Sequence, residues 1–243
     1  MLFFGALVGF FVIPNIADNS GRKGALRVAW VVGIVSVLVT VMSDSPRIIG
    51  FRLFFIGFGT NPAITLAFSF INEQCLGKAR QRFGVGVQIG LALGESTIAL
   101  IFLSELTWRT IMTVLLLLFV LAYIPLELCL KETPMYLIEK SAHLTLKLLN
   151  EIGKINKKDV ITEEEFRTLQ PRGVQQEEGS EVGIKDLFKY KSLRWISIST
   201  GFIFMGIQTI YYSTTLNLGD VGFSKTINQV IFGVSEMFGY VAA

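Results

Sequence analysis

Five polar side chains lie inside otherwise apolar stretches of the sequence and are its first candidates for chemistry: Arg52, Gln88, Glu95, Gln208 and Glu236. An ionisable side chain is costly in lipid, so one found there marks a functional site or is paired between helices. For Glu95 and Glu236, which fall near the middle of their stretches, both interpretations stay open. Arg52 lies about one turn into its stretch, where a long side chain can also extend toward water.

Two adjacent tyrosines, Tyr211 and Tyr212, follow Gln208 in the same stretch. An aromatic ring attracts an organic cation through its face, which would place both tyrosines in a binding cavity. Tyrosines also gather at membrane surfaces as an aromatic belt. The sequence alone leaves these two roles open.

The sequence lacks the residue sets of common enzyme sites. It has one histidine, no Ser/His/Asp set, no cluster of metal ligands and no G-x-x-x-x-G-K-[ST] phosphate loop. Its two cysteines, Cys75 and Cys129, have neither metal-binding nor redox spacing. We therefore expect no enzyme activity, no metal and no cofactor, and no nucleic-acid partner, since membrane topology accounts for the basic residues.

Composition indicates which elements carry these residues. Hydrophobic residues make up 51% and charged residues 17% of the 243, whereas a soluble domain carries about 25% charged residues. A run of roughly 20 apolar residues crosses a bilayer as a helix. We expect an all-α, polytopic transmembrane bundle with about seven membrane helices, over 1–16, 25–43, 48–71, 84–104, 109–130, 195–216 and 226–243.

Positive charge alternates between the connections of these runs. Of the 22 Lys and Arg residues, 18 lie in the first, third and fifth connections, and 12 of those lie between Lys131 and Arg194. Basic loops remain on the cytoplasmic or matrix side of a membrane. The alternation therefore orients the chain and supports the count of seven.

The fifth connection, residues 131–194, is long and polar. Apolar residues at helical spacing over 144–155 predict a short amphipathic helix, and residues 162–165 (TEEE) fit a capping box that starts another. Residues 170–183 have the composition of a flexible linker. This connection is either a solvated loop between two membrane halves or a docking surface for a partner.

Two series of glycines predict close helix packing. Gly5 and Gly9 share one helix face, and Gly86, Gly90 and Gly94 share another. Small residues at this spacing let two helix backbones approach each other in lipid.

Two loops carry motifs of a known family. Residues 17–23 (ADNSGRK) resemble the D-R-x-G-R-K signature of the major facilitator superfamily. Residues 132–137 (ETPMYL) are similar to the E-S-P-R-W-L that follows the sixth helix of its organic cation and anion transporters. Further matches follow in family order at Asp186-Leu187-Phe188, Tyr211-Tyr212, Leu216-Asn217-Leu218, Gly222 and Glu236.

The resemblance implies a partial major facilitator fold, with helices two to eight of twelve. It implies an N-terminal bundle of five membrane helices over 1–131, a loop with short helices over 132–194, and two helices of a C-terminal bundle over 195–243. It assigns a gating loop to Asp18, Gly21, Arg22, Lys23, Arg52 and Glu132, although Asn19 stands where the family has Arg. It also implies that Glu236 faces the central cavity. Together with the polar and aromatic residues singled out above, this gives Glu236, Tyr211, Tyr212, Gln208 and Glu95 as the expected substrate-binding residues.

Two functions from different classes follow. The first is a secondary transporter of small organic ions that works by alternating access. The second is a structural or accessory subunit derived from a transporter, whose apolar faces contact other membrane subunits. Two opposed bundles need about twelve spans, more than 243 residues provide, so the chain is either short or part of a longer one. We expect an integral multi-pass protein of the plasma membrane or of an organelle membrane such as the mitochondrial inner membrane.

Overall fold

The computed structural model describes all residues except 44, 105, 170–187, 221 and 243. The described residues form helices and connections only. The long helices are α1 (Leu2–Ser20), α2 (Arg22–Met42), α3 (Pro46–Gln74), α4 (Gly77–Phe102), α5 (Trp108–Cys129), α10 (Lys191–Leu216) and α11 (Lys225–Ala242). The short ones are α6 (Pro134–Lys140), α7 (Ala142–Ile155), α8 (Glu163–Leu169) and the 3-10 turn η1 (Leu218–Asp220).

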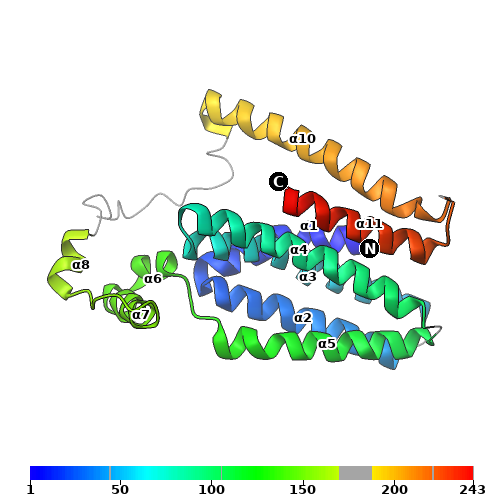
Figure 1. Ribbon diagram of the computed structural model, residues 1–243, viewed down its shortest axis with the longest axis horizontal. Helices are drawn as coiled ribbons and strands as arrows, with labels where there is room; N and C mark the ends of the chain where they lie inside the picture. The colour runs from blue at the N-terminus through cyan, green and yellow to red at the C-terminus, as the bar shows by residue number, and fades with distance from the viewer. Residues whose placement is uncertain (44, 105, 170–187, 221, 243) are drawn as a thin grey trace.

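The predicted all-α membrane bundle is confirmed. Helices α1 to α5 are each long and apolar enough to cross a membrane, and they run side by side with α6 to α8 at one end (Figure 1). Helices α10 and α11 occupy the two other expected positions and have the length of a span. Among the described residues, the composition of a membrane span is found for five of these seven helices.

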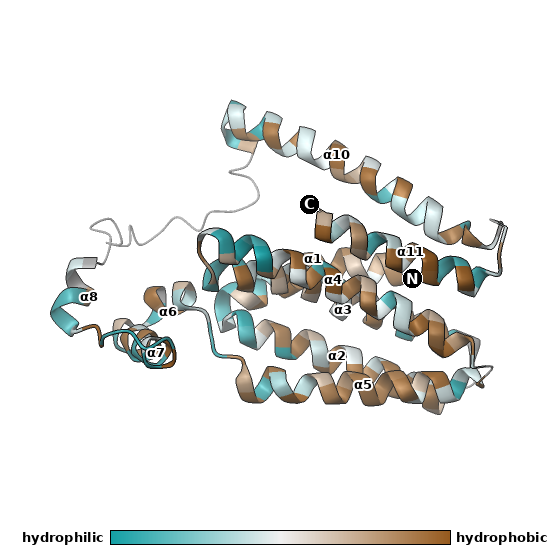
Figure 2. Cartoon of the chain, in the orientation of Figure 1, coloured by the Kyte–Doolittle hydropathy of each residue, from teal (hydrophilic) through white to brown (hydrophobic). Residues whose placement is uncertain are grey.

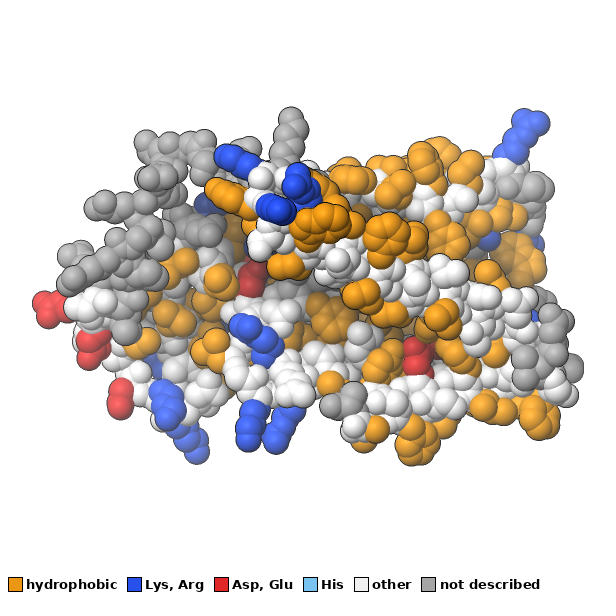
Figure 3. Space-filling view, turned by 90° about the horizontal axis from the view of Figure 1, so that it is seen from above, with side chains coloured by type: hydrophobic (Ala, Val, Ile, Leu, Met, Phe, Trp, Pro, Cys, Tyr) orange, Lys and Arg blue, Asp and Glu red, His pale blue; other side chains and the backbone are white. Residues whose placement is uncertain are grey.

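Hydropathy follows this arrangement. The long helices are mostly hydrophobic, whereas α6 to α8 and the adjoining helix ends mix hydrophilic with hydrophobic residues (Figure 2). On the face that carries α10, hydrophobic side chains extend over much of the molecule, and most Lys and Arg side chains lie toward the end with the short helices (Figure 3). The basic end is the one that topology assigns to the cytoplasm or matrix.

Several helices extend beyond the predicted runs, and the largest difference is at the start of the fourth. The fourth long helix begins at Gly77 and not near residue 84, so Lys78, Arg80 and Arg82 lie within α4 and not in a loop. Lys and Arg are good helix formers, and a helix can continue beyond the bilayer surface. The side chain of Arg80 donates hydrogen bonds to the carbonyl oxygens of Asn72 (2.7 Å) and Cys75 (3.1 Å), which satisfies carbonyls at the end of α3.

Helices α1, α2 and α3 enclose the core. Its buried residues are Ile13, Ala17, Ala25, Leu26, Ala29, Leu66 and Phe70. The predicted close approach at Gly5 and Gly9 is confirmed, because a Cβ at either glycine would collide with the backbone of α3 at Phe54 or Phe58. The turn between α1 and α2, described below, lies at the basic end of this core.

The second glycine series does not behave as predicted. A Cβ added at Gly86, Gly90 or Gly94 would meet nothing within 4 Å, so no other described helix packs closely on this face of α4. A different face of α4 packs on α11, where a Cβ at Gly233 would collide with the Ser96 side chain. Helix α10 has no buried residue and touches α1 through the edge-to-face rings of Tyr212 and Phe3, 5.1 Å apart.

The polar connection contains the predicted short helices. Helix α7 begins at Ala142 and ends at Ile155, with Ser141 as its N-cap. The predicted capping box is also present, since Glu165 accepts hydrogen bonds from the backbone amide and the hydroxyl of Thr162, both at 3.0 Å. The predicted linker over 170–183 lies outside the described residues.

Candidate functional site

The turn between α1 and α2 consists of one residue, Gly21. Its φ of +87° lies in the left-handed region, which favours glycine because a Cβ is strained there. A Cβ at this position would also collide with the carboxylate of Glu132 and come within 3.1 Å of the Tyr136 ring. Both the backbone and the neighbours therefore require glycine at position 21.

Glu132 caps the start of α2 from a distant part of the chain. Its carboxylate accepts hydrogen bonds from the backbone amides of Arg22 (2.9 Å), Lys23 (3.1 Å) and Thr133 (3.0 Å). The first amides of a helix lack partners within the helix, and the helix dipole favours negative charge at that end. Glu132 meets both requirements because Gly21 leaves room for it.

Arg22 connects the same turn to α1 and α3. Its Nε lies 2.9 Å from Glu73 Oε1 and its Nη1 lies 3.0 Å from Asp18 Oδ1. The Glu73 side chain is 14% exposed, whereas that of Asp18 is 70% exposed. Since solvent screens exposed pairs, Glu73 is the stronger partner of Arg22. The predicted pairing of Asp18 with Arg22 is found, but it is the weaker of the two.

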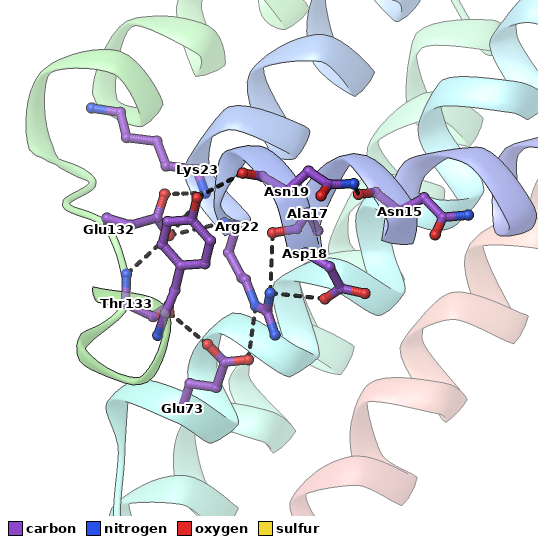
Figure 4. A network of polar contacts seen from close by, with 10 residues as sticks. Asn15, Ala17, Asp18, Asn19, Arg22, Lys23, Glu73, Glu132 and Thr133 are labelled. Carbon is purple, nitrogen blue, oxygen red and sulfur yellow. Dashed lines mark hydrogen bonds and ion pairs between the residues drawn. The ribbon is translucent and has the colours of Figure 1, made fainter. Parts of the chain in front are cut away.

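Helix α6 completes this polar network (Figure 4). The Thr133 hydroxyl donates to Glu73 Oε2 at 2.6 Å, and the Tyr136 hydroxyl donates to the Asn19 carbonyl oxygen at 2.8 Å. The network thus joins the ends of α1 and α3, the start of α2 and the segment after α5. We call these residues the turn network: Asp18, Asn19, Gly21, Arg22, Glu73, Glu132, Thr133 and Tyr136.

The remaining predicted gating residues lie beside or away from the turn network. The backbone amide of Lys23 donates a hydrogen bond to Glu132, whereas its side-chain Nζ donates to the Glu127 carbonyl oxygen at 2.8 Å. Arg27, which is not one of the predicted gating residues, pairs beside Lys23 with the Glu127 side chain at 2.6 Å, where both are exposed. Arg52 lies on α3 about 31 Å along the helix from Glu73 and does not join the network.

Sequence reasoning missed Glu73 and Tyr136. Glu73 is the one acidic residue of α3 and lies at the end of that helix. A lone carboxyl group at the same membrane face as the basic loop between α1 and α2 could have indicated a pair with one of its arginines. Tyr136 lies within the family-like segment 132–137, but nothing in the sequence indicated that its hydroxyl reaches Asn19.

A second cluster joins α4, α10 and α11. The Tyr211 hydroxyl on α10 donates to Glu95 Oε1 on α4 at 2.6 Å, and Glu95 Oε2 is buried without a hydrogen-bond partner in the described part of the chain. On α11, Tyr240 donates to Glu236 Oε1 at 2.8 Å, and the Phe232 ring lies 5.7 Å from the Tyr211 ring. We call Glu95, Tyr211, Phe232, Glu236 and Tyr240 the interbundle cluster.

The interbundle cluster adjoins a cavity between α4 and α11. This cavity holds about 490 Å³, and its lining includes Glu95, Phe102, Lys225 and Gln229. Glu236 lies one helical turn after Phe232 on α11, on the side of that helix that meets the Tyr211 ring. The structure therefore brings carboxyl groups and aromatic rings together at one interface between helices.

Two other predicted binding residues lie outside this arrangement. Gln208 is on α10 but is exposed, and no described contact connects it to Glu95. Tyr212 packs on Phe3 and on the edge of Tyr211, with ring centroids 5.5 Å apart. Of the five predicted binding residues, the cluster gathers three: Glu95, Tyr211 and Glu236.

A protein-family model described as "Sugar (and other) transporter" matches residues 1–243, the whole chain. The chain belongs to this family. This confirms the resemblance to the major facilitator superfamily that the loop motifs indicated, and it identifies a family of transporters and not of enzymes.

Known relatives of this transporter family share low identity with the chain over nearly all of its length. Organic cation/carnitine transporter 4 of Arabidopsis thaliana is 24% identical over 98% of the chain and 46% of its own length. Solute carrier family 22 member 15 of Xenopus tropicalis is 23% identical over 98% of the chain and 43% of its own length. Sugar transporter ERD6-like 8 of Arabidopsis thaliana is 21% identical over 98% of the chain and 50% of its own length. The chain spans about half the length of the curated relatives it matches.

Proposed function

We propose that the chain forms part of a secondary transporter of small organic cations that works by alternating access, with the interbundle cluster as its cation site. The family supports transport, and relatives named for organic cations and for sugars are both among its matches. The choice of a cation rests on the charge of the interbundle cluster.

The hydrogen bond between Tyr211 and Glu95 carries this proposal. It joins α4 of the first five helices to α10 of the last two, and it leaves Glu95 Oε2 buried without a described partner. A buried carboxylate oxygen is costly without a partner, and an organic cation would provide one. The rings of Tyr211 and Phe232 offer faces for cation–π contact with the same ligand.

The turn network supports the conformational part of the proposal. Alternating access needs one group of helices to rock against another around a central site. The network ties α1, α2, α3 and α6 into one unit at the basic end. We infer that this unit moves as one body, with α10 and α11 on the other side of the interbundle cluster.

The alternative function, an accessory subunit without transport, has no support among the relatives cited above, two of which are named as transporters and one as a solute carrier. It nevertheless makes a distinct prediction. A purely structural subunit would bind no organic cation at Glu95, and substitution of that residue would leave any cation flux unchanged.

Binding of radiolabelled tetraethylammonium to the chain in proteoliposomes tests the proposal. We expect saturable binding that the Glu95→Gln variant loses and that Glu163→Gln retains, because Glu163 lies in the exposed first turn of α8. Saturable binding that is equal in the Glu95→Gln variant would contradict the cation site. Absence of saturable binding to wild type would favour the accessory subunit.

A further inference from the structure

A buried side chain, Asn228, holds the connection between α10 and α11. This connection, residues 217–224, joins the two helices at the end of the molecule opposite α6 to α8 (Figure 1). Asn228 lies near the start of α11, and its side-chain amide donates hydrogen bonds to the carbonyl oxygens of Leu218 (2.6 Å) and Phe223 (3.1 Å). One side chain therefore ties both ends of the connection to α11.

The burial of these groups makes the tie strong. Asn228 is 5% and Leu218 is 7% exposed, and a buried polar group that loses its partner costs more free energy than one that water can reach. Ser224 adds to the tie, because its hydroxyl accepts a hydrogen bond from the backbone amide of Ile227 at 3.4 Å, in the manner of a helix N-cap. The end of α10 is thus fixed relative to the start of α11.

Helix α11 is in turn anchored on α4. A Cβ at Gly233 would collide with the Ser96 side chain and would come within 3.2 Å of the Ala92 carbonyl oxygen, so the two helix backbones approach closely there. Gly233 lies five residues after Asn228 on α11. The placement of α10 relative to α4 therefore depends on two contacts: α11 packs on α4 at Gly233, and the connection is bound to α11 at Asn228.

Tyr211 lies within two helical turns of this connection. It precedes Leu218 by seven residues, which is about 10 Å along a helix. Phe232 lies one turn after Asn228 on α11 and thus on the same side of that helix, and its ring centroid is 5.7 Å from that of Tyr211. The tie at Asn228 therefore determines where the Tyr211 ring lies and whether its hydroxyl reaches Glu95 Oε1, which is 2.6 Å away.

We propose that Asn228 is a positioning residue of the interbundle cluster, which fixes α10 against α11 and thereby places Tyr211 at Glu95. The connection takes up its amide group, so Asn228 acts on the cation site through Tyr211 and not by touching the ligand. Its effect on cation binding rests on the proposed function, whereas its effect on the placement of α10 does not.

The length of α10 makes this placement measurable. The helix has 26 residues, so its start lies about 39 Å from the connection, and a tilt of about 10° there would move that start by roughly 7 Å. Ser192 on α10 and Gln81 on α4 are exposed and lie near the basic ends of their helices. Both can carry a spin label as cysteine variants once the free cysteines, Cys75 and Cys129, are replaced by serine.

Double electron–electron resonance between these two labels on the full chain tests the proposal. Asn228→Leu nearly preserves the size of the side chain but removes both N–H donors, so we expect its distance distribution to shift or broaden by several ångströms. Asn217→Ala is the matched control, because Asn217 is an exposed asparagine of the same connection whose amide donates within its own helix to the Ser213 carbonyl oxygen at 2.7 Å. The control should reproduce the wild-type distribution. An unchanged distribution in Asn228→Leu, or an equal change in Asn217→Ala, would overturn the proposal.

A second variant keeps the test decisive if Asn228→Leu folds poorly. Leu218→Ala removes the buried side chain of the residue whose carbonyl oxygen Asn228 binds. It should change the distance between the labels in the same way as Asn228→Leu. A wild-type distribution in Leu218→Ala would mean that the connection does not set the placement of α10.

Binding of tetraethylammonium shows whether Asn228 acts through Tyr211. Asn228→Leu and Tyr211→Ala should each weaken saturable binding by about fivefold to tenfold, the factor for one cation–π contact. The double variant should bind no more weakly than Tyr211→Ala alone, and additive losses would overturn the action through Tyr211. Absence of binding to wild type would contradict the proposed function, and the distance between the labels would still decide the placement of α10.

Discussion

Glu132 Oε1 lies 2.9 Å from the backbone nitrogen of Arg22, a residue 110 positions earlier in the chain. This contact places a carboxylate at the start of α2, in the space that a side chain at Gly21 would need. The family-like loop and the family-like segment after α5 thus form one structural unit. Their proximity explains why a glycine precedes Arg22.

Substitution Gly21→Ala should destabilise the protein by about 1–3 kcal/mol, because alanine is strained at positive φ and would displace Glu132. The free energy of unfolding, from denaturant titration in detergent, measures this. Gly50→Ala is the control, since Gly50 lies in α3 with open space around it. The double variant Gly21→Ala with Glu132→Ala should lose less unfolding free energy than the sum of the losses in the two single variants. Strictly additive losses would show that the two residues do not compete for space.

Substitution Glu73→Gln should cost about 1.5–3 kcal/mol, the range for a hydrogen bond to a charged group, because Arg22 would lose its better-buried anionic partner. Asp18→Asn should cost about 0–1 kcal/mol, as is usual for an exposed ion pair. Thermal unfolding of the two variants in detergent compares these losses. Equal shifts would mean that the difference in exposure between Glu73 and Asp18 does not decide the strength of the pairs.

Substitution Tyr136→Phe removes the hydroxyl that donates to the Asn19 carbonyl oxygen. We expect a loss of about 0.5–1.5 kcal/mol and faster amide exchange in the turn between α1 and α2. Tyr190→Phe serves as the control, because Tyr190 is an exposed residue outside the turn network. Exchange rates that do not change at this turn would show that α6 does not hold it in place.

The fold followed from the sequence because its signals are local. Runs of apolar residues with basic loops between them predicted the long helices. Ser141 is the N-cap of α7, and Thr162 belongs to the capping box that begins α8. The start of α4 was misplaced because hydropathy marks the bilayer and not the helix, which continues through Lys78 and Arg80.

The site was only partly predictable because its contacts join distant segments. Glu95 and Tyr211 were each recognisable as polar groups in apolar runs, but only the packing of α4, α10 and α11 brings them within hydrogen-bond distance. Glu73 was missed for the same reason, because its role is to pair with Arg22, which is 51 residues away in the sequence. Gln208 looked similar to Glu95 in the sequence, yet it is exposed, as are most residues of α10.

The capping box of α8 predicts a pH dependence. Hydrogen bonds from the Thr162 backbone amide and then from its hydroxyl lower the pKa of Glu165 below its ordinary value of 4.5. The resulting stabilisation is fully present above that ordinary pKa and is lost as pH falls through the lowered one. Thr162→Ala removes the hydroxyl and keeps the backbone amide, so carboxyl NMR of labelled protein should show a partial rise in the pKa of Glu165 in Thr162→Ala and no rise in Thr162→Ser. An unchanged pKa in Thr162→Ala would show that the hydroxyl does not contribute to the shift.

The interbundle cluster is the centre of the proposed function, and charge selectivity tests it most directly. Binding of choline and of its neutral isostere 3,3-dimethyl-1-butanol can be compared by calorimetry on wild-type and Glu95→Gln protein. The proposed site predicts that wild type prefers choline by about tenfold or more, as one lost charge-assisted contact implies, and that Glu95→Gln loses the preference. Equal binding of the two ligands by wild type, or an unchanged preference in the variant, would contradict a cation site at Glu95.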